Sequence, residues 1–456
     1  MSESLAAALA RAGSPVELLR NLDFPPSTFP VKPEFTNWRS EQRSWLESCA
    51  LLDQSHHMTD LFVEGPDALR LFSDVGVNTF ANFGVGKAKQ FVAVNPDGHL
   101  IGDAILFHLE EELFDLVGHP MVIDWVTFHL ERGDYEATAD RDDNSIVRQS
   151  GPPKFYRYEL QGPTAPALME ELLGEAPPEV TFFNMTEFTI AGKRVIALRH
   201  GMAGAPGFEL FGPWADGEAV RQALIDAGKD HGLRLSGART YSSNTLESGW
   251  IPSPMPAVYS GEKMKAFRQW LPANTYEAIA SLGGSFSSNN IEDYYLTPYD
   301  LGYGPVVKFD HDFIGREALE KIAQGPKRQK VTLELNSEDV AKCIASQFQR
   351  ERAGRAKFFE FPSAVYSTLP YDKVTKDGKT IGISTWVGYS SNEGRMLTLA
   401  MIEAEHSTPG TQVTFVWGEE GGGSSKPTVE RHVQTEIRAT VAPVPYADPA
   451  RKDYRA

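Results

Sequence analysis

Two neighbouring histidines stand in the segment Leu52–Met58, which reads Leu-Asp-Gln-Ser-His-His-Met. Imidazole titrates near neutral pH, so His56 or His57 could exchange a proton during a reaction, and the amide of Gln54 could hold a substrate oxygen. Adjacent side chains point to different sides of a strand or a helix, so these two rings cannot readily hold one metal ion. We therefore expect no metal site here, and we expect at least one of the two histidines to be structural.

Two further motifs that carry chemistry in other enzymes are incomplete. Gly84-Val85-Gly86-Lys87 lacks the third glycine of a dinucleotide-binding turn, and Ala88 stands where a phosphate-binding loop has Ser or Thr. The sequence contains no Gly-x-Ser-x-Gly elbow. Neither nucleotide binding nor a serine nucleophile is indicated.

Size and charge exclude several classes of protein. With 456 residues the chain is longer than one hydrophobic core usually supports, so we expect two or three domains. A formal net charge of −17 disfavours nucleic acid as a partner. The only cysteines, Cys49 and Cys343, predict neither a disulfide framework nor a cysteine metal site. No run approaches 18 apolar residues and no leader segment is evident, so we expect a cytoplasmic protein without membrane contact.

The elements that position these residues follow from the apolar patterns. Met1–Asn21 is predicted as an amphipathic helix, Phe24–Phe35 as an extended proline-rich segment, and Trp38–Leu51 as a helix. Strands are then predicted at Asp60–Val63, Gln90–Asn95, Asp103–His108 and Glu112–Val117, with helices at Pro66–Ser73 and Pro120–Arg132. This order predicts an α+β layer.

A second, similar unit follows, with its Gly162-Pro163 answering the Gly65-Pro66 of the first. Its predicted elements are a strand at Phe155–Leu160, a hairpin at Thr189–Leu198, a strand at Phe208–Gly212 and a helix at Ala215–His231. A helix is predicted to end within Ala318–Pro326. From Lys330 onward the chain has short strands, with turns at Lys376-Asp377-Gly378 and Gly421–Lys426. This pattern predicts a barrel or small sandwich. We expect two intertwined subdomains in residues 1–325, divided near residue 150, and a β-rich domain in 326–456.

Four segments resemble signatures of the glycine-cleavage T-protein superfamily, which moves one-carbon groups to and from tetrahydrofolate. They are Asn95–Asp103, Arg199–Glu209, Leu246-Glu247-Ser248-Gly249, and Thr297-Pro298 with Lys308–Leu319. The resemblance extends over nearly the whole chain. It implies an α+β folate-binding fold of two related subdomains with a C-terminal β-barrel, and tetrahydrofolate as the cofactor.

Within this superfamily, Gln54–Met58, Phe182–Met185 and Tyr241–Pro254 resemble the tetrahydrofolate-dependent aromatic O-demethylases, and most nearly those that act on syringate. The resemblance implies a methyltransferase that converts syringate to 3-O-methylgallate, or vanillate to protocatechuate. The methyl group would pass to N5 of tetrahydrofolate and give 5-methyltetrahydrofolate. The expected partners are therefore a small aromatic acid and the folate.

Two departures from the T-protein pattern bear on the reaction. The acidic pair of the family is reduced to Gly102-Asp103, and Met202 and Ala205 replace its Tyr and Glu. Aminomethyl transfer handles a cationic intermediate that favours two carboxylates, whereas the loss of one suits a neutral or anionic aromatic substrate. The alternatives are another folate-dependent aminomethyl- or methyltransferase, such as an amine or sulfonium demethylase, and a non-catalytic folate-binding protein of iron–sulfur assembly. The latter carries a Lys-Gly-Cys-Tyr signature that surrounds neither cysteine here.

We predict His57 and Tyr241 as the acid–base pair. An aryl ether resists displacement because it must expel a phenolate, and a proton delivered to the leaving oxygen typically contributes ~10² to 10⁴ in rate. An unperturbed tyrosine, with a pKa near 10, is roughly matched to a phenol. His57 could instead hold the free phenol group of the substrate, and the sequence does not separate these two roles.

The resemblance also implies the binding residues. Glu209 would accept two parallel hydrogen bonds from the pterin edge, and Val117, Phe183 and Trp250 would line the folate pocket, although aromatic residues are often simply core. Substrate contacts are implied for Gln54, Phe29, His119 and Trp250. His119 stands where vanillate-preferring relatives carry arginine, and its shorter side chain would leave room for a second methoxy group, which favours syringate. An ordinary loop histidine is the alternative.

Overall fold

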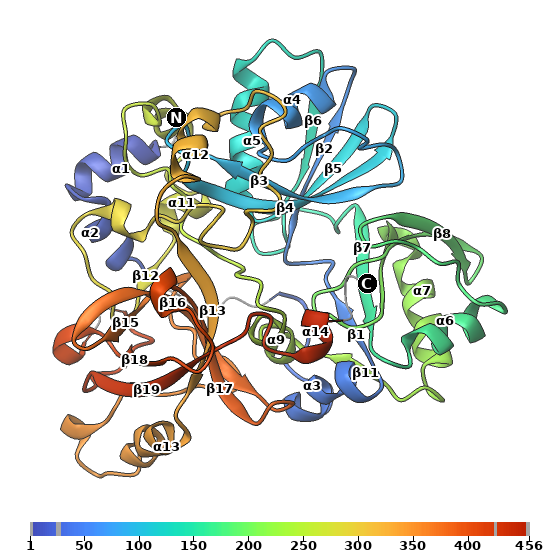
Figure 1. Cartoon of the computed structure of the whole chain (residues 1–456). Coiled ribbons are helices and arrows are strands. Elements are labelled where there is room, and N and C mark those ends of the chain that lie inside the picture. Colours follow the sequence, from blue (N-terminus) through green and yellow to red (C-terminus); the bar gives the residue numbers. More distant parts are fainter. Residues whose placement is uncertain (1–2, 24–28, 424–425, 453–456) are drawn as a thin grey trace.

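The structure is a computed structural model that describes residues 3–23, 29–423 and 426–452. It contains two large open sheets, a two-stranded sheet and a closed barrel (Figure 1). Helices and sheets are mixed throughout the first two thirds, and the barrel occupies the last third. The predicted α+β class with a C-terminal barrel is therefore confirmed.

The first large sheet has five antiparallel strands, in the order β3 (Ala88–Val94), β4 (Leu100–Glu110), β5 (Leu113–Gly118), β2 (Thr59–Glu64) and β6 (Thr138–Asp142). Helices α4 (Ala68–Val75) and α5 (Pro120–Arg132) pack against it. Gly65 makes the turn into α4 at a φ of 140°, where a side chain would collide with the backbone of Glu136. Strand β6 was not predicted, because its Thr-Ala-Asp-Arg-Asp sequence is polar and mostly exposed.

The second large sheet has six strands, in the order β11 (Leu233–Ser236), β1 (Cys49–Asp53), β7 (Phe155–Gln161), β10 (Gly207–Pro213), β9 (Lys193–Leu198) and β8 (Met185–Ile190). Helices α6 (Ala165–Leu173) and α7 (Trp214–Ala227) cover one face. Gly162 makes the turn before α6 at a φ of 140°, the same value as Gly65 in the first unit. The two units thus share this strand-to-helix turn, as the Gly-Pro pairs indicated.

One predicted helix is wrong at its end. Helix α3 (Trp38–Glu47) stops at Glu47, and Cys49–Leu51, predicted as its last turn, belongs to β1. The run Cys-Ala-Leu-Leu is buried between β11 and β7, and its backbone pairs with both. A short apolar run fits a buried strand as well as a buried helix, so periodicity could not separate them.

The N-terminal segment forms two helices, α1 (Leu5–Ala12) and α2 (Pro15–Arg20), where one was predicted. Gly13 adopts a left-handed φ of 78°, and the Ser14 side chain caps α2. Of the predicted extended segment Phe24–Phe35, residues 24–28 lie outside the described residues. Residues 29–35 carry no helix or strand.

The chain between the second sheet and the barrel returns to the first sheet. Its short elements are α8 (Ala238–Tyr241), α9 (Asn244–Ser248), α10 (Lys265–Trp270), α11 (Tyr276–Ile279), β12 (Leu282–Gly283), η1 (Ile291–Tyr294) and α12 (Arg316–Ile322). Apolar residues from Ile251 to Leu319 share one core with the first sheet. The second sheet likewise receives β1 from the N-terminal part of the chain.

The barrel closes in the order β13 (Arg328–Leu335), β17 (Arg395–Glu403), β16 (Lys379–Ser390), β15 (Asp372–Lys376), β18 (Gln412–Trp417) and β19 (Thr435–Ala442). It lies at the lower left of Figure 1, in orange and red. The remaining elements of this part are α13 (Ser337–Ser346), η2 (Arg352–Gly354), β14 (Leu369–Pro370), η3 (Ala404–His406), η4 (Glu420–Gly422) and α14 (Asp448–Lys452). The predicted turn at Asp377-Gly378 joins β15 to β16, with both residues at positive φ.

Candidate active site

A cavity of about 640 Å³ brings residues from both large sheets together with residues of the barrel. Seven predicted site residues line it: Gln54, Val117, His119, Phe183, Glu209, Tyr241 and Trp250. His57 and Phe29 lie directly behind this lining, since His57 contacts Tyr241 and the ring of Phe29 is 5.9 Å from that of His57. The volume is in the range of small-molecule sites.

Tyr241, at the end of α8, and His57, in the turn after β1, form a hydrogen-bonded pair. Tyr241 Oη lies 2.7 Å from His57 Nε2. Burial, followed by the nearby His119, lowers the pKa of His57 to about 4, so the ring is neutral at pH 7. The backbone of Gln54 forms a hydrogen bond with the ring that favours its charged form, which a carbonyl does by accepting an N–H. Nε2 is then left to accept the hydroxyl proton of Tyr241.

The pKa of Tyr241 differs from that of an unperturbed phenol. Burial, with Glu159 and Glu209 adding to it, raises the pKa of Tyr241 well above its ordinary value. Its hydroxyl group also lies 2.8 Å from Met202 Sδ, a weak acceptor. Tyr241 is therefore a hydrogen-bond donor that keeps its proton, and complete transfer to a phenolate would be uphill.

Glu209 on β10 presents a carboxylate at the cavity wall, with 5% of the residue exposed. Arg157 Nη1 lies 3.4 Å from its Oε1, and His200 Nδ1 lies 3.7 Å from its Oε2. Burial alone would raise the pKa of Glu209, but His200 and Arg157 outweigh it and lower the pKa. The carboxylate is thus ionised, and its two oxygens make only long contacts to the described residues.

Arg157 on β7 fixes this carboxylate and was missed in the sequence. Its guanidinium also pairs with Asp60 on β2 and Asp115 on β5, so one buried cation joins the two sheets. The rings of Phe107 and Phe211 lie about the guanidinium at 5.1 and 4.8 Å. A lone arginine in a strand gives no sequence signal of such a position.

Asp103 on β4, recognised in a family motif but not placed in the predicted site, also lines the cavity. A single oxygen, Oδ2, accepts hydrogen bonds from Gln90 Nε2, from Trp250 Nε1 at 3.0 Å and from Tyr303 Oη at 2.9 Å. Burial raises the pKa of Asp103, and these three donors oppose that rise. The bond from Trp250 fixes the indole ring at the cavity wall.

The apolar part of the wall includes Val117 at the end of β5 and Phe183 before β8. Phe183 has a φ of 61°, which is rare for an aromatic residue and carries backbone strain. Its ring lies 5.0 Å from that of His200, and its carbonyl accepts the backbone N–H of Ala88. The strain is therefore held by neighbours that place this ring at the cavity.

His119 and His56 occupy different environments. His119 is the N-cap residue of α5, and its side chain makes no capping bond; its Nε2 lies 3.4 Å from Ser253 Oγ. Its Nδ1 is buried and has no hydrogen-bond partner among the described residues. Burial lowers the pKa of His119 to about 4. His56 points away from the cavity, to Ser145 Oγ at 2.8 Å and the ring of Trp214, so it is the structural member of the His56-His57 pair.

The barrel side of the cavity carries four basic residues in a chain with an overall charge of −17: Lys327, Arg328, Lys330 and Arg451. They stand at the start of β13 and in α14. The sequence showed Lys327 and Arg328 only as a polar connection between domains. Their position gives the cavity a local positive charge that an anionic ligand would need.

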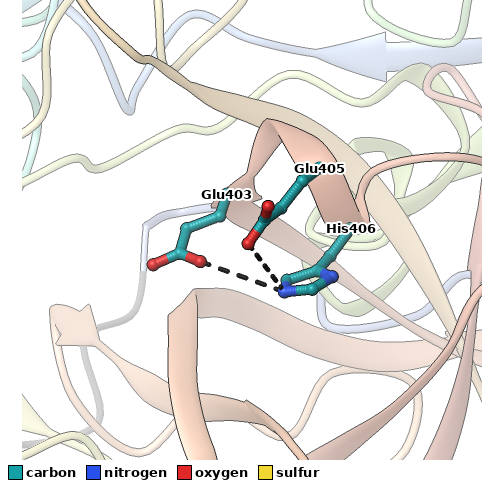
Figure 2. A group of neighbouring side chains, drawn as sticks. All are labelled: Glu403, Glu405 and His406. Atoms are coloured by element: carbon teal, nitrogen blue, oxygen red, sulfur yellow. Dashed lines mark ion pairs between the residues drawn. The ribbon is translucent and has the colours of Figure 1, made fainter.

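A carboxylate–imidazole cluster lies outside the cavity, where β17 ends. Figure 2 shows Glu403, Glu405 and His406, with His406 Nε2 4.0 and 3.4 Å from the two carboxylates. Within the described ranges it is the only such group whose atoms could meet at a metal ion. Both glutamates are exposed, and the ion pairs account for the arrangement. None of the described helices is long and apolar enough to cross a membrane.

The chain is similar to one protein family and to individual known proteins. The family model described as the GCVT N-terminal domain matches residues 1–253. A syringate O-demethylase of Sphingobium sp. is 54% identical over 455 residues, covering 100% of this chain and 98% of that protein. A sesamin methylene transferase of Sinomonas sp. is 32% identical over 399 residues, covering 85% and 83%.

Among solved structures, the glycine cleavage system aminomethyltransferase T of Bartonella henselae matches with a TM-score of 0.61 at 19% identity. The match covers 94% of this chain and 95% of that chain. It confirms the predicted T-protein-like fold.

Proposed function

The chain belongs to the GCVT family, as its motifs predicted, and we propose that it demethylates a methoxylated benzoate with tetrahydrofolate as the methyl acceptor. The observation that carries this proposal is the full-length similarity to a syringate O-demethylase, joined to a cavity that holds the predicted site residues. Syringate would give 3-O-methylgallate, and vanillate would give protocatechuate. In either case the methyl carbon leaves the aryl oxygen and joins N5 of tetrahydrofolate, whose N5 proton balances the phenol product.

The residues at the cavity fit a reduced folate. Glu209 offers an ionised carboxylate whose oxygens make only long contacts within the described part of the chain, which suits the adjacent N–H groups of a pterin edge. Val117 and Phe183 supply apolar walls beside it, and the basic residues of the barrel side suit the carboxylates of a folate tail. Tetrahydrofolate, when bound, supplies the nucleophilic nitrogen.

Position is the first contribution of the chain to catalysis. Methyl transfer requires the ether carbon to lie in line with the acceptor nitrogen at roughly 3–3.5 Å. A site that holds both groups in this geometry removes the entropic cost of bringing two separate molecules together in the right orientation. Residues of the two sheets, the 244–305 segment and the barrel all meet at this one cavity. Ligands that fill this cavity displace its water, which strengthens the polar contacts inside.

Tyr241 and His57 provide the second contribution. Negative charge develops on the aryl oxygen as the methyl group leaves, and a fixed donor there lowers the barrier. Tyr241 has a single hydroxyl proton, which His57 accepts in the structure, and we propose that this proton turns to the aryl oxygen when the substrate is bound. Because the pKa of Tyr241 is raised, it stabilises that oxygen by a hydrogen bond and keeps the proton. His57, neutral and fixed by the Gln54 backbone, holds the Tyr241 hydroxyl group in the cavity.

Substrate selection is assigned to His119, with Gln54, Trp250 and Phe29 as further contacts. His119 lines the cavity, so its ring can contact a ring substituent or a carboxylate of the substrate. Its side chain is shorter than arginine, so a dimethoxylated ring has more room. This supports syringate as the preferred substrate.

Incubation of the protein with tetrahydrofolate and syringate, vanillate or an amine-type methyl donor tests the proposal. Loss of the aromatic methoxy group, at a rate that depends on the folate, is the expected result. Turnover of an amine or aminomethyl donor without reaction of either aromatic acid would replace the proposal by the alternative transferase.

A further inference from the structure

Glu159 on β7 is a fully buried carboxyl group next to the cavity wall. Its Oε1 accepts the backbone N–H groups of Met202 at 2.6 Å and Ala203 at 3.3 Å. Its Oε2 contacts one end of the side-chain amide of Gln54. The other end of that amide makes no hydrogen bond to a described residue and belongs to a side chain that lines the cavity.

Glu159 stands directly opposite Glu209 in the pairing of β7 with β10. Two carboxylates so placed cannot both be ionised cheaply in a buried site. Arg157 pairs with Glu209 but forms no ion pair with Glu159 among the described residues. Glu209 therefore takes the negative charge, and Glu159 is the member that keeps a proton.

The surroundings on every side agree with this assignment. The ionisable groups that interact with Glu159 are Glu209 on β10 and Tyr241 on α8. His57 and His200 lie one contact further away, against Tyr241 and Glu209 respectively, and Leu52 of β1 lies opposite Glu159 in the sheet. Burial and then Glu209 raise the pKa of Glu159 to about 8, against the lowering effect of Met202, Ala203 and Gln54.

A protonated carboxyl group must donate as well as accept. Oε1 already accepts two N–H groups, so the proton belongs on Oε2, whose partner is Gln54. A carboxamide keeps its shape when its oxygen and nitrogen exchange places. Turned in this way, Gln54 accepts the proton with its oxygen and directs its NH₂ group to the cavity.

We infer that Glu159 carries a proton in the folded protein and donates it to the Gln54 side-chain oxygen, so that the Gln54 NH₂ group faces the leaving aryl oxygen. The aryl oxygen belongs to the proposed function, whereas the proton and the amide orientation do not depend on it. Glu159 is then a positioning residue that decides whether the NH₂ group or the oxygen of the Gln54 side chain faces the cavity. A donor stabilises the developing phenolate, and an amide oxygen in the same place would repel it.

The pH dependence of kcat/KM tests this inference on the whole enzyme. In the wild type, ionisation of Glu159 should lower kcat/KM by about tenfold between pH 7 and 9. Glu159→Gln keeps both acceptor and donor but cannot ionise, so it should stay within about threefold of wild type at pH 7 and lose this decline. Glu159→Leu, which removes both, should lose ~10² in kcat. An unchanged decline in Glu159→Gln would overturn the inference.

Gln161→Ala is the matched control. Gln161 lies two residues along β7 and accepts the same Ala203 N–H at 2.9 Å, but it does not titrate. Its loss should lower activity without moving the alkaline decline. A shift equal to that of Glu159→Gln would mean that loosening of the 200–203 loop, and not a proton, causes the effect.

Infrared spectroscopy separates this inference from the proposed function. The wild type without ligand at pH 6.5 should show a carboxylic-acid C=O band that is missing in Glu159→Gln and fades above pH 8. Absence of that difference overturns the inference, whatever the activity. A band in a protein that demethylates no methoxybenzoate would leave the proton assigned and reject the proposed function.

Discussion

Tyr241 Oη and His57 Nε2 lie 2.7 Å apart, although 184 residues separate them in the chain. The neutral imidazole can only accept at this nitrogen, because its other nitrogen serves the Gln54 backbone. The hydroxyl group is thereby fixed at the cavity wall, with a pKa that keeps it protonated. The single hydroxyl proton points to His57, and we expect it to turn to the aryl oxygen when the substrate is bound.

Tyr241→Phe removes that donor and little else. We expect kcat to fall by ~10² to 10³, while the dissociation constant for tetrahydrofolate changes little. Steady-state kinetics and calorimetric titration measure the two quantities. Tyr446→Phe is the control, because its hydroxyl group bonds to Glu334 outside the cavity. A parallel loss of folate affinity and kcat in Tyr241→Phe would assign the tyrosine to binding.

Glu209→Gln should weaken tetrahydrofolate binding by ~10- to 100-fold, since a charged acceptor is replaced by an amide that offers one oxygen. Titration of the folate against the variant checks this. The control is Glu187→Gln on β8 of the same sheet, where the carboxylate is exposed and paired with Arg194. Equal affinities of Glu209→Gln and wild type would place the pterin elsewhere.

His119→Arg should lower the ratio of kcat/KM for syringate over vanillate by ~10-fold, a typical effect of filling space in a pocket. Competition of the two acids in one reaction measures the ratio directly. His406→Arg, in the cluster outside the cavity, should leave it unaltered. The specificity role would be withdrawn if both variants kept the wild-type ratio.

Acid should destabilise the fold through its buried histidines. Burial lowers the pKa of His57 and of His119 to about 4, below the unfolded value near 6.5. The unfolded chain therefore binds more protons between pH 6.5 and 4, and stability falls as the pH falls through this window. His119→Asn should reduce the loss of unfolding free energy between pH 7 and 5 by about 1–2 kcal/mol. Urea unfolding at both pH values measures it, and an identical loss in the variant would contradict a neutral His119.

The sequence predicted the elements best where local signals mark their ends. Helix Pro120–Arg132 matches at both ends, because proline stands at its first position and Gly133 follows its last. The Trp38–Leu51 helix was wrong where a short apolar run became β1. In that case tertiary pairing with β7 and β11, and not local preference, decides the conformation.

Residues of the cavity wall were predictable where a family motif contains them. Glu209 and Tyr241 lie in such motifs, and both line the cavity. Arg157 and Glu159 were missed, because their strand has the same residue pattern whether its polar side faces solvent or a second sheet. Only the apposition of the two sheets shows that this side is buried.

Transfer of a labelled methyl group tests the central claim most directly. Syringate carrying ¹³C in its methoxy groups is incubated with the enzyme and tetrahydrofolate, and the products are followed by NMR. We predict that the label appears as a methyl group on N5 of the folate in equal amount to the 3-O-methylgallate formed. Label recovered as methanol or formaldehyde, or demethylation without folate, would contradict the account.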